Sequence, residues 1–245
     1  MKFQGITGNF TEAGAEAVAV ADCRGEKAAG GLRKERDILT GGVLAGVMKN
    51  EEFKGDIGQT ALLRFVPKGK VTASRALLIG VGDKKEYKAH SVASVSGGAT
   101  RYLRKRSVKS FALLPRCDAG ATEVAQYAVQ GFITSQFELD KYKTKDKNTK
   151  TVNGLIVCID GAKPAAIKGG IARGQAIGDS MNLTRDLANE PPNILQPTEM
   201  AKRAQAMAKA VGLKCEVYDE AWMTKQGMGS LMSVTLGSTQ PAKLI

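Results

Sequence analysis

A pair of adjacent prolines near the C-terminal end places the strongest constraint on how this chain can fold. Pro191 and Pro192 cannot continue a helix, and each favours extended backbone at the residue before it. Pro197 suits the first turn of a following helix, where its missing N–H would have no partner in any case. Residues 182–198 therefore predict a helix, a rigid elbow and a second helix, and the elbow would fix the angle between two domains.

Short apolar runs alternate with amphipathic stretches over the first 160 residues. Continuous apolar runs are typical of strands covered on both faces, and apolar residues three or four apart are typical of helices. The alternation predicts a three-layer α/β domain with a largely parallel sheet. We expect strands at 17–21, 61–66, 76–81, 108–114 and 155–159, helices at 39–49, 89–105 and 122–137, and an exposed lysine-rich loop at 141–150.

A long helix is predicted from about residue 164 to residue 188. Gly170, Gly174 and Gly178 recur along it every four residues and leave one face nearly bare. Each glycine costs about 1 kcal/mol relative to alanine inside a helix. We therefore expect another helix or strand to pack closely against the glycine face.

The residues after the elbow predict the opening of a second α/β domain. An apolar stripe indicates a helix at 200–211, which Gly212 would end. Asp219 can cap a short helix that carries Trp222, and Gly227 can close it. Strands are expected at 213–218, 231–236 and 241–245. The series would end on a strand without completing a domain.

Several segments, taken in order, match the motifs of one known family. Residues 185–197 read R-D-L-A-N-E-P-P-N-I-L-Q-P, where the family pattern is R-D-L-x-N-x-P-P-N-x-L-x-P. The family's G-M-G and G-S follow at 227–229 and 237–238, and the segments 137–144 and 77–82 are similar to two further family motifs. The chain thus resembles the leucyl aminopeptidases, the M17 family of cytosolic metallo-aminopeptidases.

The resemblance implies a domain organisation and a function. It implies a macro-domain-like N-terminal domain over 1–162, a linker helix over 163–190, and the truncated opening of the catalytic domain over 191–245. The function that it implies is a cytoplasmic enzyme that removes N-terminal amino acids from peptides. By the same resemblance, the partners would be peptide substrates and a homo-oligomer, a hexamer in the family, or else the missing catalytic portion.

The chemistry implied by the resemblance lies outside this sequence. Family members hold two divalent metal ions, Mn or Zn, which activate a water for attack on the peptide bond. The family's V-G-K-G-x-x-F-D and N-T-D-A-E-G-R motifs, which carry the metal ligands, do not occur here, and the family would place them after Ile245. We therefore expect no catalytic, metal-binding or cofactor-binding residue within 1–245, no bound metal, and no activity of this chain alone.

No independent catalytic motif stands out. His90 is the single histidine, so no Ser-His-Asp or Cys-His set can be built, and H-E-x-x-H, Walker A and G-x-S-x-G sequences do not occur. Gly80-Val81-Gly82 lacks the third glycine of a dinucleotide fingerprint and is expected to turn the chain sharply at the carboxyl edge of the sheet. The scattered Cys23, Cys117, Cys158 and Cys215 are expected to be mostly buried, reduced thiols.

The charge distribution supports a second hypothesis. The net charge is +12, and residues 1–160 hold 26 Lys and Arg against 17 Asp and Glu. The densest basic cluster comprises Arg101, Arg104, Lys105, Arg106 and Lys109. The alternative function is therefore a basic macro-like module that binds nucleic acid or supports assembly. Residues 1–6 lack the continuous apolar run of a signal peptide, and no apolar run is long enough to span a bilayer, so we expect no membrane partner.

Overall fold

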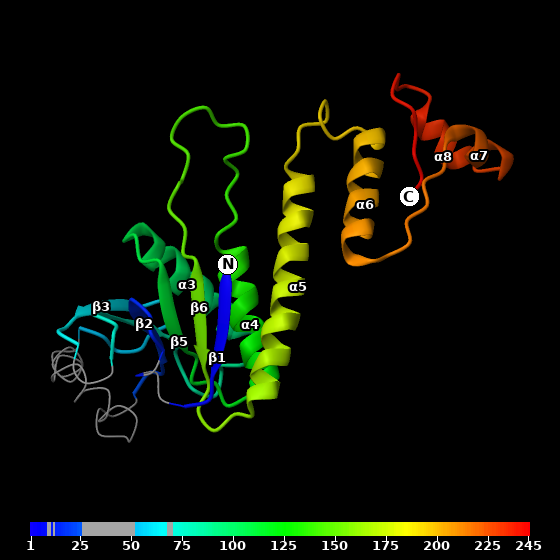
Figure 1. Cartoon of the computed structure of the whole chain (residues 1–245). Coiled ribbons are helices and arrows are strands. Elements are labelled where there is room, and N and C mark those ends of the chain that lie inside the picture. Colours follow the sequence, from blue (N-terminus) through cyan, green and yellow to red (C-terminus); the bar gives the residue numbers. More distant parts are fainter. Residues whose placement is uncertain (9–10, 12, 26–51, 68–70) are drawn as a thin grey trace. The chain divides into compact units, whose positions relative to one another are not determined.

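The structure is a computed structural model that describes residues 1–8, 11, 13–25, 52–67 and 71–245 (Figure 1). The chain divides into two compact units, unit 1 over Met1–Leu183 and unit 2 over Thr184–Ile245. Within the described ranges, no helix has both the length and the apolar character needed to cross a membrane.

A six-stranded sheet runs through unit 1 (Figure 1). Its strand order is β1-β6-β5-β2-β4-β3, and every neighbouring pair is parallel except β3 with β4. The predicted α/β fold with a largely parallel sheet is confirmed. The strands are β1 (Lys2–Ile6), β2 (Ala17–Asp22), β3 (Thr60–Arg64), β4 (Arg75–Gly80), β5 (Ser110–Leu114) and β6 (Gly154–Cys158).

The apolar runs predict five of these strands to within two residues at each end, but they do not predict β1. Its sequence, K-F-Q-G-I, mixes polar and apolar residues, and none of its five residues is buried. The strand lies at the edge of the sheet and pairs only with β6. An edge strand of this kind is defined by its neighbour's backbone, which leaves little trace in its own hydrophobicity.

The central strands β2 and β4 are buried on both faces of the sheet, which explains their continuous apolar runs. In β2, Ala17, Ala19 and Ala21 belong to one hydrophobic cluster, and Val18 and Val20 belong to another. The helices α3 (Ser91–Lys105) and α4 (Ala121–Thr134) contribute to the first cluster and confirm two predicted helices. The helix expected at 39–49 lies outside the described residues.

Helix α5 (Pro164–Ala188) packs its glycine face directly on α4. A Cβ added at Gly170 would lie 2.3 Å from the carbonyl oxygen of Thr122, and one added at Gly174 would lie 2.3 Å from that of Gln126. At Gly178 the nearest atom is Cβ of Ile133, at 3.0 Å. The expected close approach of another element to this face is confirmed.

Unit 2 contains the last turn of α5, the elbow and three further helices. These are α6 (Pro197–Val211), α7 (Glu220–Lys225) and α8 (Gly229–Thr235). Gly212 ends α6 in the left-handed conformation with φ of 74°. Asp219 caps α7 by accepting a hydrogen bond of 2.9 Å from the backbone N–H of Trp222, and Gly227 follows with φ of 73°. The predicted ends of both helices are confirmed.

The strands predicted in unit 2 are wrong. An isolated antiparallel bridge between Tyr218 and Leu244 is all that forms of the strand expected at 213–218 and of the strand expected at 241–245. Residues 231–236 lie mostly in α8 instead. A strand needs a hydrogen-bonded neighbour, and a short apolar run does not distinguish helix from strand by periodicity.

The close contact between α5 and α4 gives a stability prediction with a matched control. We expect Gly174→Ala to lower the free energy of unfolding by about 1–3 kcal/mol, because the new methyl group would overlap the backbone of α4. Gly169→Ala, on the same helix with no atom within 4 Å of its added Cβ, should instead stabilise by about 1 kcal/mol. Thermal or urea denaturation of both variants checks this, and equal effects would contradict the packing.

Candidate functional site

The family-like segment of the sequence forms the elbow of unit 2. The backbone N–H groups of Ile194 and Leu195 both donate to the carbonyl oxygen of Pro191 at 2.9 Å, which closes a tight turn. Gln196 is extended, with φ of −83° and ψ of 164°, and Pro197 takes the first helical position as expected. The two prolines and this turn leave the chain few alternative paths between the two helices.

Arg203, on α6, joins three carboxylates around this elbow. Its Nη1 lies 2.8 Å from Oε1 of Glu190 and 3.8 Å from Oδ2 of Asp186, and its Nε lies 3.1 Å from Oε1 of Glu199. The Glu190 side chain is only 1% exposed, so its charge depends on this partner. Hydrogen bonds from Arg203, first to Glu190 and then to Glu199, raise the pKa of its guanidinium.

The sequence indicates only part of this cluster. Glu199 and Arg203 are four residues apart on a helix, a spacing at which opposite charges meet. Asp186 and Glu190 are one turn apart and share the Nη1 of Arg203, but their contact with a residue beyond the elbow is set by tertiary structure. No pattern in the sequence marks that contact.

The acidic residues of this region do not fit a two-metal centre. Asp186, Glu190 and Glu199 all face the positive charge of Arg203. Asp219 caps α7, and Oε1 of Glu220 accepts a hydrogen bond of 2.8 Å from the N–H of Ala242. In the part of the chain that the structure describes, no group of three or more His, Cys, Asp or Glu residues could hold a metal ion.

The carboxyl edge of the sheet in unit 1 carries the G-x-G segment and a buried ion pair. Gly82 has φ of 74° and donates to the carbonyl oxygen of Gly55 at 2.9 Å, and a Cβ at Gly80 would lie 2.0 Å from the carbonyl oxygen of Asp56. These contacts support the expected sharp turn. Asp22, at the end of β2 and 3% exposed, pairs with Arg116, which follows β5. The pair joins the ends of two adjacent strands.

His90 lies at the surface, and the four cysteines are buried or partly buried. His90 is exposed at the start of α3 and makes no side-chain cap. Cys23 and Cys158 are buried, Cys117 and Cys215 are partly buried, and all four are free thiols, as expected. Burial raises the pKa of Cys158 to about 12 and is also the largest cause of the raised pKa of Cys117. Such thiols hold little thiolate at neutral pH.

The predicted basic cluster is partly occupied by contacts within the protein. Nη2 of Arg104 lies 2.5 Å from Oε1 of Glu138, and the Arg104 side chain is 11% exposed. The guanidinium of Arg106 stacks 3.6 Å from the ring centroid of Tyr102. Two of the five cations that suggest polyanion binding therefore have structural partners.

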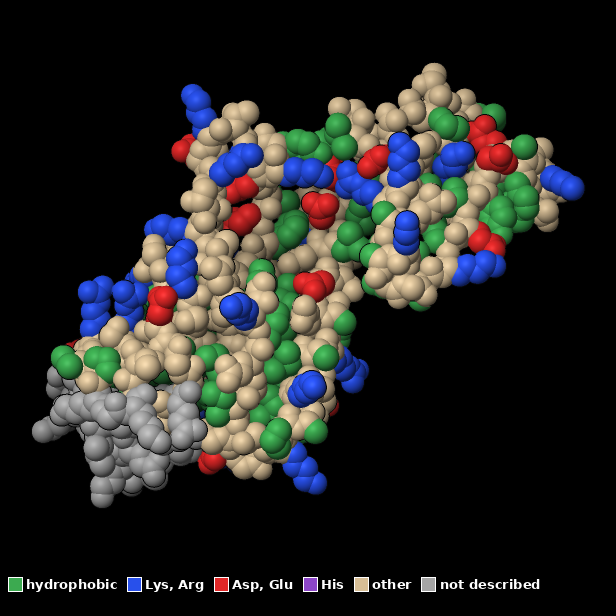
Figure 2. Space-filling view, viewed as in Figure 1, with side chains coloured by type: hydrophobic (Ala, Val, Ile, Leu, Met, Phe, Trp, Pro, Cys, Tyr) green, Lys and Arg blue, Asp and Glu red, His purple; other side chains and the backbone are tan. Residues whose placement is uncertain are grey.

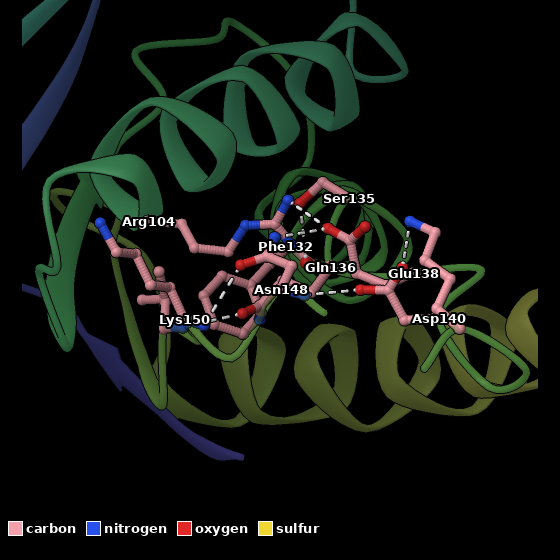
Figure 3. A network of polar contacts seen from close by, with 10 residues as sticks. Arg104, Phe132, Ser135, Gln136, Glu138, Asp140, Asn148 and Lys150 are labelled. Carbon is pink, nitrogen blue, oxygen red and sulfur yellow. Dashed lines mark hydrogen bonds and ion pairs between the residues drawn. The ribbon is translucent and has the colours of Figure 1, made fainter. Parts of the chain in front are cut away.

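The lysine-rich loop at 141–150 is exposed, as predicted, but polar contacts fasten it at both ends (Figure 3). The N–H of Asn148 donates to Oδ2 of Asp140 at 2.7 Å, and its side-chain amide donates to Oε1 of Glu138 at 2.9 Å. Nζ of Lys150 donates to the carbonyl oxygen of Lys105 at 3.2 Å. Hydrogen bonds from Lys143, then from the Asn148 N–H, lower the pKa of Asp140.

The elbow cluster yields a testable prediction. Arg203→Ala removes the guanidinium from the buried Glu190, so we expect faster hydrogen exchange of the backbone over residues 186–203 and a melting temperature lower by several degrees. Lys202→Ala is the control, since Lys202 is 70% exposed and its contact to Glu199 is 3.9 Å long. Equal effects of the two substitutions would show that the cluster does not hold the elbow.

A second prediction concerns the loop. Asp140→Asn removes the charge that accepts from Lys143 and Asn148, so we expect trypsin to cut residues 141–150 about two- to tenfold faster at neutral pH. The pKa of Asp140 is lower in the folded state than in the unfolded state. The ionised Asp140 carboxylate therefore stabilises the loop fully at pH values above its unfolded pKa, and this stabilisation is lost as the pH falls through its folded pKa. Asp160→Asn removes an exposed charge outside this loop and should leave cleavage of residues 141–150 unchanged.

Comparison with known proteins identifies the chain's relatives. Residues 17–146 match the N-terminal domain of the cytosol aminopeptidase family, and residues 182–245 match its catalytic domain. A probable cytosol aminopeptidase of Alkaliphilus metalliredigens is 30% identical over 251 residues, which cover 100% of this chain and 50% of that protein. The cytosol aminopeptidase of Pseudomonas aeruginosa is 34% identical over 88% of this chain and 44% of that protein.

Solved structures support the same fold. A tomato leucine aminopeptidase mutant superposes with a TM-score of 0.84 at 20% identity, over 99% of this chain and 49% of that one. A bottromycin maturation enzyme in complex with Mn gives a TM-score of 0.69 at 23% identity, over 93% of this chain and 43% of that one. The chain thus spans half or less of the length of these relatives. The two family matches together confirm the resemblance seen in the motifs, and the chain belongs to the cytosol aminopeptidase family.

Proposed function

We propose that this chain supplies the N-terminal domain and the opening of the catalytic domain of a cytosol aminopeptidase. The enzyme would remove N-terminal amino acids from peptides by two-metal hydrolysis, with Mn or Zn. The observation that carries the proposal is the match of residues 182–245 to the family's catalytic domain, which follows the match of residues 17–146 to its N-terminal domain.

The finer organisation belongs to the same proposal. We assign residues 1–162 to a macro-domain-like N-terminal domain, 163–190 to a linker helix and 191–245 to the catalytic domain. The mostly parallel sheet of unit 1 and the uninterrupted helix α5 support this assignment. A cytoplasmic location and a homo-hexamer are proposed from the family alone.

The metal ligands would come from family segments that this chain does not carry. The sequence lacks both ligand motifs, and the acidic side chains of unit 2 contact Arg203, a helix N-terminus, a backbone N–H or, at Glu216, Lys214 and Tyr218. In this proposal, residues 1–245 alone have no aminopeptidase activity.

The alternative, a basic module that binds nucleic acid, is not favoured. Both family matches indicate an aminopeptidase, and Arg104 and Arg106 already have partners within unit 1. The loop contact between Lys150 and the end of α3 adds positive charge to this surface, but nothing in the structure selects a nucleic acid over solvent.

Activity measurements test the proposal. The chain alone, given Mn or Zn and a leucyl chromogenic substrate, should show only background hydrolysis. The same chain joined to the half of the Alkaliphilus metalliredigens relative that it does not match should show metal-dependent turnover.

Two outcomes would contradict this function. One is metal-dependent turnover by the chain alone that is lost in Asp186→Asn, which would place a metal site within residues 1–245. The other is a joined protein that is folded and monodisperse but inactive with either metal and with several aminoacyl substrates.

A further inference from the structure

Unit 2 has almost no hydrophobic core of its own. Its buried apolar side chains are Ala201, Ala208, Met223 and Ala242, and three of these four are alanines. Unit 1, by contrast, fully buries Phe111, Phe132 and several leucines and valines. A unit of about this size needs large buried side chains to offset its conformational entropy. Unit 2 therefore lacks a core sufficient for its own stability.

Unit 2 does not lack apolar residues. Many of its large apolar side chains lie on its surface instead of in a core. Val234 is 81% exposed, Leu236 is 82% exposed and Leu213 is 63% exposed. Figure 2 shows hydrophobic side chains open on this unit. The others above one third exposure are Ile194, Met200, Met207, Val211, Leu231 and Ile245. Unit 2 therefore carries apolar surface that an interaction partner could cover.

Two local features of unit 2 also lack the packing that would stabilise them. Helix α8 has seven residues and buries none of them, although helices this short gain most of their stability from tertiary packing. Tyr218 and Leu244 exchange two backbone hydrogen bonds, of 2.9 and 3.1 Å, in an isolated bridge. A pair of extended segments is marginal in water until a further strand or a helix covers it.

We propose that the apolar residues Leu213, Val234, Leu236 and Ile245 form a docking face for the half of a cytosol aminopeptidase that this chain does not match. The occupant follows from the comparisons. Residues 182–245, nearly all of them in unit 2, match the family's catalytic domain. The Alkaliphilus metalliredigens relative covers the whole chain, and a further half of its own length lies beyond the match. The partner's identity rests on the proposed function.

The test supplies that partner as a separate polypeptide. The full chain, tagged, is co-expressed with the unmatched half of the Alkaliphilus metalliredigens relative, and the complex is measured by co-purification and light scattering. The relative's own matched half, produced in the same way, gives the reference recovery. We expect a one-to-one complex of this chain with the unmatched half.

Matched variants locate the surface. Val234→Asp with Leu236→Asp should weaken the complex at least about a hundredfold, because two charges would enter an apolar interface. Val66→Asp, at an 80% exposed valine of unit 1, should leave it unchanged. Since all three side chains are at least 80% exposed, the free variants should keep the circular dichroism spectrum and melting temperature of the parent chain.

Several results would overturn the docking face. The first is that no complex forms although the two halves of the relative associate under the same conditions. The second is that the complex forms equally well with Val234→Asp and Leu236→Asp. The third is a homodimer of this chain that these two substitutions disrupt and that the unmatched half does not displace. The last would make a second copy the occupant. A complex that forms as expected but has no aminopeptidase activity would leave the docking face standing and count against the proposed function.

Discussion

The architecture of unit 1 depends on backbone-to-backbone packing of α4 between α3 and α5. A Cβ at Gly131 of α4 would lie 2.1 Å from the carbonyl oxygen of Ala93 on α3, and a Cβ at Gly174 of α5 would lie 2.3 Å from that of Gln126 on α4. The hydroxyl of Ser96 donates to the carbonyl oxygen of Ala128 at 2.6 Å between the same two helices, α3 and α4. Because no side chain separates these backbones, small changes in volume at the contacts would displace whole helices.

Much of the helix and strand packing in unit 1 could be predicted from the sequence, because it depends on local patterns. The features that could not be predicted depend on contacts between distant residues. The glycines of α5 recur with the period of a helix face, so their contact with another element follows from local information. The apolar runs of β2 and β4 report burial on both faces. Strand β1 pairs with β6, far away in the chain, and the contact of Lys150 with the carbonyl oxygen of Lys105 joins residues 45 positions apart. The strands expected at 213–218 and 231–236 fail because, among the described residues, their only pairing is the isolated bridge between Tyr218 and Leu244.

Residues of the family motif stabilise the elbow of unit 2. Glu190 lies within the family motif, and its carboxylate is buried against Arg203, while Pro191 supplies the carbonyl that closes the turn. A buried charge with one principal partner specifies geometry, because any shift of the elbow would leave it desolvated and unbalanced. A sequence motif can therefore identify a hydrolase family although its residues stabilise the backbone conformation and take no part in the reaction.

The contrast between the two units shows where the stability of each comes from. Unit 1 places its large apolar side chains between a sheet and helices, where Phe132 contacts both Phe3 and Phe111, with ring centroids 5.6 and 5.9 Å apart. Unit 2 has leucines, valines and methionines too, but half of them are exposed and only Met223 is buried. Its helix ends and its turn are nonetheless well formed, with Asp219, Gly212 and Pro197 each in the position that its chemistry favours. The helix-capping and turn residues of unit 2 thus agree with its fold. Its number of large apolar side chains, by contrast, is typical of a domain with a larger hydrophobic core than unit 2 contains. This combination is typical of a segment that contributes one layer to a domain and depends on further layers for its burial.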